Sequence, residues 1–133
     1  MHQFKVAKLV RDKIAQNMIA NENASYQVLN DKNFIHQLKK KILEEAKELV
    51  PVKDKEKMIK EIADLQEIIN ALIKALKSSK KEVKAKQREE NKKSGSFKKR
   101  LYIEKIELDN KHPWLDYYLS HPKKYPKIKE KSN

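Results

Sequence analysis

Two pairs of carboxylates, each pair three residues apart, are the feature of this sequence that most clearly indicates chemistry. The first pair is Glu45 and Glu48, and the second is Glu61 and Asp64. Residues three apart on a helix share a face one turn apart, so each pair can direct its oxygens toward one point. Two adjacent helices would bring all four carboxylates together, where they repel one another unless cations neutralise them. Because every ligand is an oxygen, the pattern predicts a Mg²⁺ site, with Mn²⁺ as an alternative, rather than a zinc or copper site.

The placement of these carboxylates among apolar residues distinguishes them from ordinary surface charges. At about 100° per residue, Glu45 and Glu61 fall inside the apolar arcs of their helices, while Glu48 and Asp64 lie at the margins. Burying an unpaired carboxylate is costly or raises its pKa. A salt bridge with lysine in the bundle core is the alternative, and it is the better explanation for a lone Glu. Two such residues, each with a second carboxylate three positions on, favour bound cations. Glu44, which lies further from the apolar arc, is interpreted as a solvated residue or as one that contacts the metal ligands without binding the metal.

Apolar periodicity and capping residues predict the helices that must position these pairs. Four helices are expected at about residues 8–21, 31–50, 54–77 and 79–93, and a short one after His112. Segments near residues 27 and 103 are expected to form at most a small β-pair. The predicted fold is therefore all-α and resembles a four-helix bundle.

Composition limits the class of protein further. The chain has 133 residues and no Cys, which excludes disulfides and thiolate metal sites. No stretch is apolar for long enough to span a membrane and the first residues do not open a signal peptide, so a cytoplasmic protein without membrane contact is expected. The apolar fraction of 38% is low for a large private core, and the predicted central helix is long. Both features favour a homodimer or a dimer of dimers.

Charge is unevenly distributed along the chain. There are 32 Lys and Arg against 19 Asp and Glu, a net charge of +13, and much of the excess follows residue 77. Such a charge attracts polyanions such as nucleotides or nucleic acid. The sequence predicts a helical domain, 1–109, and a basic, aromatic C-terminal extension, 110–133.

Two further segments accompany the carboxylates in a recognisable order. Residues 8–14 read Lys-Leu-Val-Arg-Asp-Lys-Ile, and residues 94–100 read Ser-Gly-Ser-Phe-Lys-Lys-Arg. Together with the ExxE and ExxD motifs, they resemble the all-α nucleoside triphosphate pyrophosphohydrolases, the MazG-like and phosphoribosyl-ATP pyrophosphohydrolase-like group. The resemblance covers roughly residues 6–107. It departs from the family pattern at Ser94, where an arginine is usual, and at Ser96, which replaces a second glycine.

This resemblance implies cleavage of a nucleotide between its α- and β-phosphates, which releases a nucleoside monophosphate and pyrophosphate. The catalytic and metal-binding residues would be the four carboxylates, Glu45, Glu48, Glu61 and Asp64. Bound Mg²⁺ would neutralise the polyphosphate and acidify the attacking water. Glu45 or Glu48 would take the water's proton. Six basic residues are candidates for phosphate binding: Lys8, Arg11, Lys13, Arg88, Lys92 and Arg100.

Two other functions fit parts of the sequence. A non-enzymatic helical protein that binds nucleic acid would explain the net charge and the basic, aromatic C-terminus. A catalytically inactive family member, acting as a scaffold or nucleotide sensor, would explain the motifs without turnover.

Overall fold

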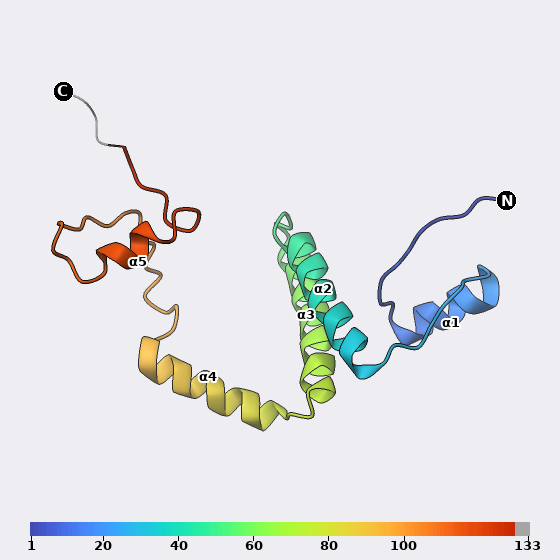
Figure 1. The fold of residues 1–133 in the computed structure, drawn as a ribbon. Helices are drawn as coiled ribbons and strands as arrows, with labels where there is room; N and C mark the ends of the chain where they lie inside the picture. The colour runs from blue at the N-terminus through green and yellow to red at the C-terminus, as the bar shows by residue number, and fades with distance from the viewer. Residues whose placement is uncertain (130–133) are drawn as a thin grey trace. The chain divides into compact units, whose positions relative to one another are not determined.

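The computed structural model describes residues 1–129, and every regular element within them is a helix (Figure 1). This confirms the predicted all-α class. The helices are α1 (Asp12–Asn21), α2 (Asp31–Leu49), α3 (Lys55–Ala75), α4 (Lys80–Ser94) and α5 (Leu115–Leu119). The chain divides into two compact units, the first ending at Gly95 and the second beginning at Ser96. This division precedes the sequence-based boundary at residue 109.

Side chains that accept hydrogen bonds from the first turn fix where three helices begin. Asn30, Asp54 and Ser79 are the N-caps, and they accept from the backbone N–H groups of Asn33, Lys57 and Glu82 respectively. Each satisfies an amide that the helix itself leaves without a partner. These caps place the starts of α2, α3 and α4 within a residue or two of the predicted positions.

Helix α4 ends at the only glycine of the chain. Gly95 has φ 84°, a backbone conformation that side-chain-bearing residues rarely adopt. Its N–H donates to the carbonyl of Asn91 and so closes the last turn. The same residue marks the end of the first unit.

Helix α1 begins later than the periodicity predicted. It starts at Asp12, whereas the sequence pattern placed its start at residue 8. Ala7 has φ 48°, and Arg11 has the extended ψ of 143°, so the residues between them do not continue the helix. As a consequence, Lys8 and Arg11 lie on an irregular segment that contacts α2 and α3 through ion pairs.

The scaffold of the first unit is the hairpin formed by α2 and α3, which lie side by side (Figure 1). Pro51 ends α2, and the N–H of Val52 donates to the carbonyl of Leu49 at the turn. Leu38, 4% exposed, is the one buried apolar side chain among the described residues. Large apolar residues of both helices remain exposed, including Leu43, Ile59, Ile62 and Ile69. Among the helices of the first unit, α2 and α3 thus form the main packed pair. The contacts among the described residues of one chain do not close a four-helix bundle.

The small β-pair expected from the sequence is not formed. Neither the segment near residue 27 nor the one near residue 103 is a strand in the part of the chain that the structure describes. Tyr26, Val28 and Ile103 are exposed, and the two segments belong to different units. A strand is stable only when a partner satisfies its backbone groups and covers one face, and β propensity alone supplies neither.

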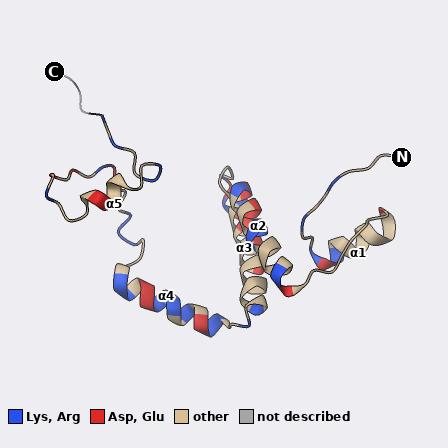
Figure 2. Ribbon diagram, in the orientation of Figure 1, with Lys and Arg blue, Asp and Glu red and all other residues tan. Residues whose placement is uncertain are grey.

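Helix α4 differs from the hairpin in carrying charged residues on all sides (Figure 2). It makes only a small contact with α3. Across residues 1–129, none of the helices combines the length and the apolar character that crossing a membrane requires.

Candidate metal centre

The α2–α3 hairpin brings Glu45 of the first carboxylate pair together with both members of the second, Glu61 and Asp64. Carboxylate oxygens of Glu45, Glu61 and Asp64 lie within 4.8 Å of one another. A second group, which also includes Glu45, joins it to Glu44 and Glu48 at the same spacing. The i, i+3 spacing places each pair on one face of its helix, and the packing of α2 against α3 brings Glu45 to the face that carries Glu61 and Asp64.

Two of these oxygens are buried and have no hydrogen-bond partner. They are Oε2 of Glu45, from α2, and Oε2 of Glu61, from α3. The side chain of Glu61 is only 13% exposed. A carboxylate oxygen that is removed from water without a compensating partner is costly to the fold. A cation that binds both oxygens would remove this cost.

The Glu45 carboxyl is strongly perturbed by its surroundings. Burial raises the pKa of Glu45 to about 7, and the neighbouring charges of Glu48 and Asp64 add to the effect, with Lys41 opposing it. Like charges brought close together disfavour the ionised form of one of them. These surroundings therefore favour the protonated form of Glu45 well above the ordinary pKa of a glutamate.

Asp64 has both carboxylate oxygens engaged by cations. Arg11 donates to Oδ1 at 2.9 Å, and Lys60 donates to Oδ2 at 3.0 Å. Lys60 also lies 3.7 Å from Oε1 of Glu61. The hydrogen bond from Lys60, together with the charges of Lys60 and Arg11, lowers the pKa of Asp64. The protein's own cations thus meet both oxygens of Asp64 and Oε1 of Glu61, whereas Oε2 of Glu45 and Oε2 of Glu61 have no partner.

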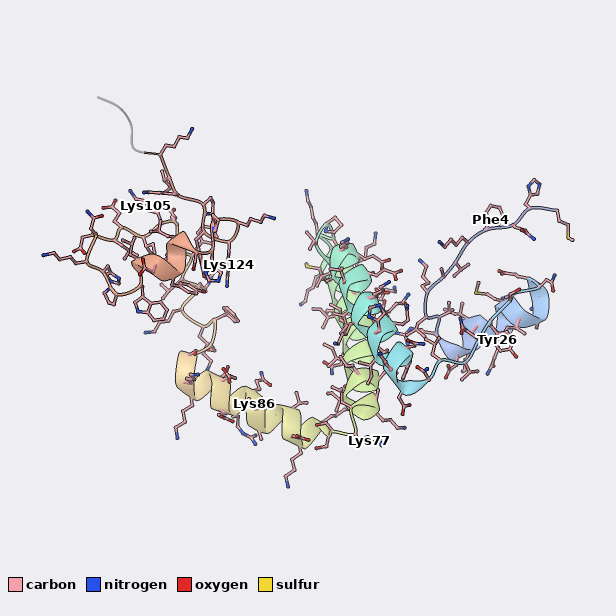
Figure 3. All side chains as sticks on the ribbon, viewed as in Figure 1. Phe4, Tyr26, Lys77, Lys86, Lys105 and Lys124 are labelled. Carbon is pink, nitrogen blue, oxygen red and sulfur yellow. The ribbon has the colours of Figure 1, made fainter. Side chains whose placement is uncertain are left out.

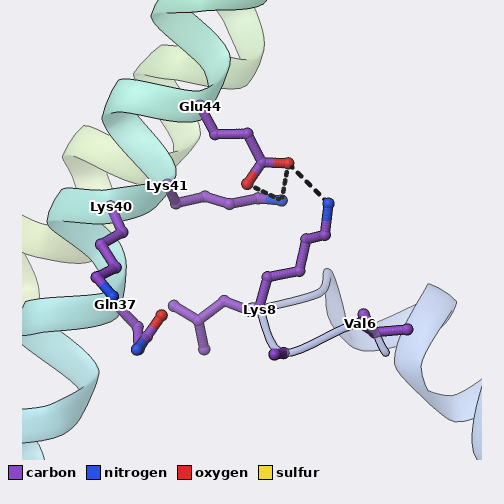
Figure 4. A pocket seen from close by; sticks show the side chains of 8 residues that line it. Val6, Lys8, Gln37, Lys40, Lys41 and Glu44 are labelled. Carbon is purple, nitrogen blue, oxygen red and sulfur yellow. Dashed lines mark hydrogen bonds and ion pairs between the residues drawn. The ribbon is translucent and has the colours of Figure 1, made fainter. Parts of the chain in front are cut away.

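A second set of ion pairs fixes the N-terminal segment to α2. Lys8 and Lys41 both donate to Glu44, at 3.2 Å and 3.4 Å (Figure 4). The hydrogen bond from Lys8 is the main reason that the pKa of Glu44 is lowered. These residues line a pocket of about 250 Å³ between the segment and α2, which Gln37 and Lys40 also border. Since Glu44 belongs to the carboxylate group around Glu45, this lysine-lined pocket adjoins the acidic cluster.

The structure brings two of the six predicted phosphate-binding residues to the cluster. Lys8 and Arg11 contact Glu44 and Asp64 directly. Lys13 on α1 is exposed, as are Arg88 and Lys92 on α4, and no ion pair of the described residues joins them to the carboxylates. Arg100 belongs to the second unit, where its N–H donates to the carbonyl of Phe97. A role in phosphate binding stays a prediction for all six.

Two residues near the cluster, Lys41 and Lys60, were not singled out from the sequence. Glu44, interpreted there as a solvated residue or a support for the ligands, belongs to the carboxylate group around Glu45. Lys41 precedes Glu44 by three positions and Lys60 precedes Asp64 by four, which are the spacings at which helical ion pairs form. That spacing was a signal available in the sequence. The partnership of Lys8 with Glu44 spans 36 residues, and no local pattern indicates it.

The donor set fits a hard divalent cation. All candidate ligands are carboxylate oxygens, and two of them, Glu45 Oε2 and Glu61 Oε2, are buried without a partner. Mg²⁺ and Mn²⁺ prefer such oxygens, and no His or Cys contributes to either group. The other two candidate ligands lie at the edge of the cluster. They are Glu48, which is exposed, and Asp64, which is ion-paired.

Comparison of the chain with protein-family models, with curated proteins and with solved structures gave no match. The case for a function therefore depends on the residues of this chain and on their arrangement.

Proposed function

We propose that the first unit is a Mg²⁺-dependent nucleotide pyrophosphohydrolase. It would cleave a nucleoside triphosphate or a related nucleotide between the α- and β-phosphates. The observation that carries the proposal is the pair of buried oxygens without partners, Glu45 Oε2 and Glu61 Oε2, on side chains that the α2–α3 hairpin brings into one carboxylate group. The similarity of residues 8–14 and 94–100 to segments of the pyrophosphohydrolases supports the same activity.

In this proposal Glu45, Glu48, Glu61 and Asp64 hold Mg²⁺, or Mn²⁺ in its place. The cation would supply positive charge that neutralises the polyphosphate and acidifies water. The water oxygen bonds to the α-phosphorus, the bond to the bridging oxygen breaks, and pyrophosphate leaves. Glu45 or Glu48, the two carboxylates that α2 contributes, receives the proton of the water.

Arg11 and Lys8 are placed to orient the substrate. Each already contacts a carboxylate of the cluster, so each lies within reach of an anion bound there. Arg11 uses one of its five N–H donors on Asp64, and the others remain for phosphate oxygens. Lys40 and Lys41, on the wall of the adjoining pocket, add positive charge beside the same position.

The direct test is the release of pyrophosphate from a panel of nucleoside and deoxynucleoside triphosphates, with Mg²⁺ or with EDTA. We expect Mg²⁺-dependent formation of monophosphate and pyrophosphate in equal amounts from at least one nucleotide, and none in EDTA. Absence of turnover on every nucleotide would reject the hydrolase. Nucleotide binding without turnover would point instead to a catalytically inactive scaffold or sensor.

The exposed apolar surface of the hairpin bears on assembly. Leu38 is the one buried apolar residue of the described chain, while Leu43, Ile59 and Ile69 on α2 and α3 are exposed. Burial of such side chains contributes about 1.5–3 kcal/mol each, so a two-helix unit gains stability from a partner that covers them. The proposal therefore includes a homodimer or a dimer of dimers as the active form.

Dilution tests this assembly. We expect sedimentation to show a species of at least twice the 15.8 kDa chain mass, and activity per chain to fall as the protein dissociates on dilution. Ile69→Lys should favour the monomer, whereas Val83→Lys, on the charged helix α4, serves as the matched control. Full activity in a demonstrated monomer would contradict the prediction.

A further inference from the structure

The second unit contains a cluster of five aromatic rings that no part of the proposed hydrolase uses. Tyr117, on α5, is its centre. Ring centroids of Trp114, Tyr118, His121 and Tyr125 lie 5.5, 5.3, 4.6 and 6.0 Å from that of Tyr117, and Tyr118 and Tyr125 are 4.8 Å apart. The spacing of three or four residues along α5 and the turn that follows brings these rings together. Such edge-to-face and tilted contacts hold the rings in fixed orientations.

The cluster is not a closed core. Trp114, the largest of the rings, is 58% exposed although it contacts Tyr117 edge to face at 89°. Tyr117 and Tyr125 are also among the exposed residues. A held aromatic ring with an open surface offers stacking area at a low cost in conformational entropy.

The second unit as a whole is positively charged. Residues 96–129 contain nine Lys and Arg against four Asp and Glu, a net charge of +5. Lys105 with Glu107 is the one ion pair found among the described residues of this unit, so most of its lysines are free for an external anion. Lys124 lies 5.4 Å from the centre of the Tyr125 ring, and Lys105 and Lys124 are both seen among the side chains of this unit (Figure 3). Cations beside open rings are the arrangement that contacts phosphates while bases stack.

We propose that the second unit binds single-stranded nucleic acid, with bases stacking on Trp114 and its neighbouring tyrosines and with phosphates contacting Lys123 and Lys124. Bases within a duplex are already stacked on each other, and an element that reads the major groove must be longer than the five residues of α5. An anionic membrane surface is the competing polyanion. It is disfavoured because the described residues of this unit hold no long amphipathic helix, the element that such surfaces bind.

Trp114 is the only tryptophan of the chain, so its fluorescence reports on this site alone. The experiment titrates the full chain with oligo(U) and oligo(dT) of about twelve nucleotides, a length within the range that single-strand binders cover. EDTA is present throughout, so that a metal-bound phosphate at the carboxylates of the first unit cannot contribute. We expect saturable quenching of Trp114 at about 50 mM salt, and affinity that falls steeply as salt is raised. A duplex of the same length should quench weakly.

Two variants separate stacking from charge, with labelled oligonucleotide and anisotropy as the readout. Trp114→Ala should weaken binding by about tenfold or more, the range expected for loss of one base–aromatic contact. The double variant Lys123→Gln, Lys124→Gln leaves the rings intact and should reduce the slope of affinity against salt while Trp114 is still quenched. Tyr26→Ala, an exposed tyrosine of the first unit, is the matched control and should change nothing.

Three results would overturn the proposal. The first is an absence of both quenching and anisotropy change with either oligonucleotide. The second is binding that Trp114→Ala leaves unchanged, which would indicate attraction by charge alone. The third is quenching by vesicles of phosphatidylcholine with phosphatidylserine but not by the oligonucleotides, which would assign the rings to a membrane surface.

Discussion

Glu61→Gln is expected to lower pyrophosphate release by at least about a hundredfold, because residues that merely support a metal ligand already account for ten- to hundredfold effects. The same change should abolish the response of thermal stability to divalent cations. In the native chain, Oε2 of Glu61 is buried and has no partner, so a cation that binds it stabilises the folded state and raises the melting temperature. The neutral amide keeps the shape of the side chain but removes the charge that attracts the cation. Melting curves with Mg²⁺, Mn²⁺ and EDTA measure this response directly.

Stability in EDTA distinguishes loss of the site from loss of the fold. Without cations, Glu61→Gln should be as stable as the wild type or more stable, because it removes a carboxylate whose buried oxygen lacks a partner. Glu67→Gln, an exposed change of the same chemistry on α3, is the matched control and should keep both activity and cation response. If Glu61→Gln retained the cation-dependent rise in melting temperature, the carboxylates would not form the metal centre.

The helices of this chain were largely predictable because their ends are set by local chemistry. Asn30, Asp54 and Ser79 accept hydrogen bonds from the first turns of α2, α3 and α4, and Gly95 closes the last. Each of these residue types is favoured at such positions for reasons that act within a few residues. The later start of α1 escaped the prediction because Lys8 and Arg11 make distant ion pairs, which local periodicity does not register.

The burial of Glu45 and Glu61 at the candidate site could also be predicted from the sequence, whereas the contact of Asp64 with Arg11 could not. The helical wheel placed Glu45 and Glu61 within apolar arcs, and these are the residues whose Oε2 atoms are buried without partners. It placed Asp64 at a margin, where one cationic partner, Lys60, is local and the other depends on tertiary structure. Arg11 reaches Asp64 from 53 positions away along the sequence, and only the packing of the N-terminal segment brings the two together. The same limit explains why the prediction of a small β-pair was wrong, since two β-like segments pair only when the fold places them side by side.

Unfolding free energy measured without divalent cations should fall as pH rises from about 5 to about 8, and Glu45 should cause the fall. Burial raises the pKa of Glu45 from 4.5 to about 7. Between these values the folded state holds a proton that the unfolded state has released, so the stability contribution is fully present below pH 4.5 and is lost as pH rises through 7. The effect is on the order of 2 kcal/mol, because each pKa unit corresponds to about 1.4 kcal/mol and partial contact with solvent reduces it. Denaturant titrations at a series of pH values measure it.

The other perturbed carboxyls act outside this window. The pKa values of Asp64 and Glu44 are lowered by Lys60 and Lys8, so their contributions are present above the ordinary carboxyl pKa and are lost only as pH falls further. Glu45→Gln should therefore flatten the profile between pH 5 and 8, whereas Glu67→Gln should leave it unchanged. Saturating Mg²⁺ should also flatten the wild-type profile, because a cation at the cluster stabilises the ionised form of Glu45. A wild-type profile that is already flat in EDTA, or a fall that survives in Glu45→Gln, would show that Glu45 does not meet its neighbouring carboxylates in a sheltered cluster.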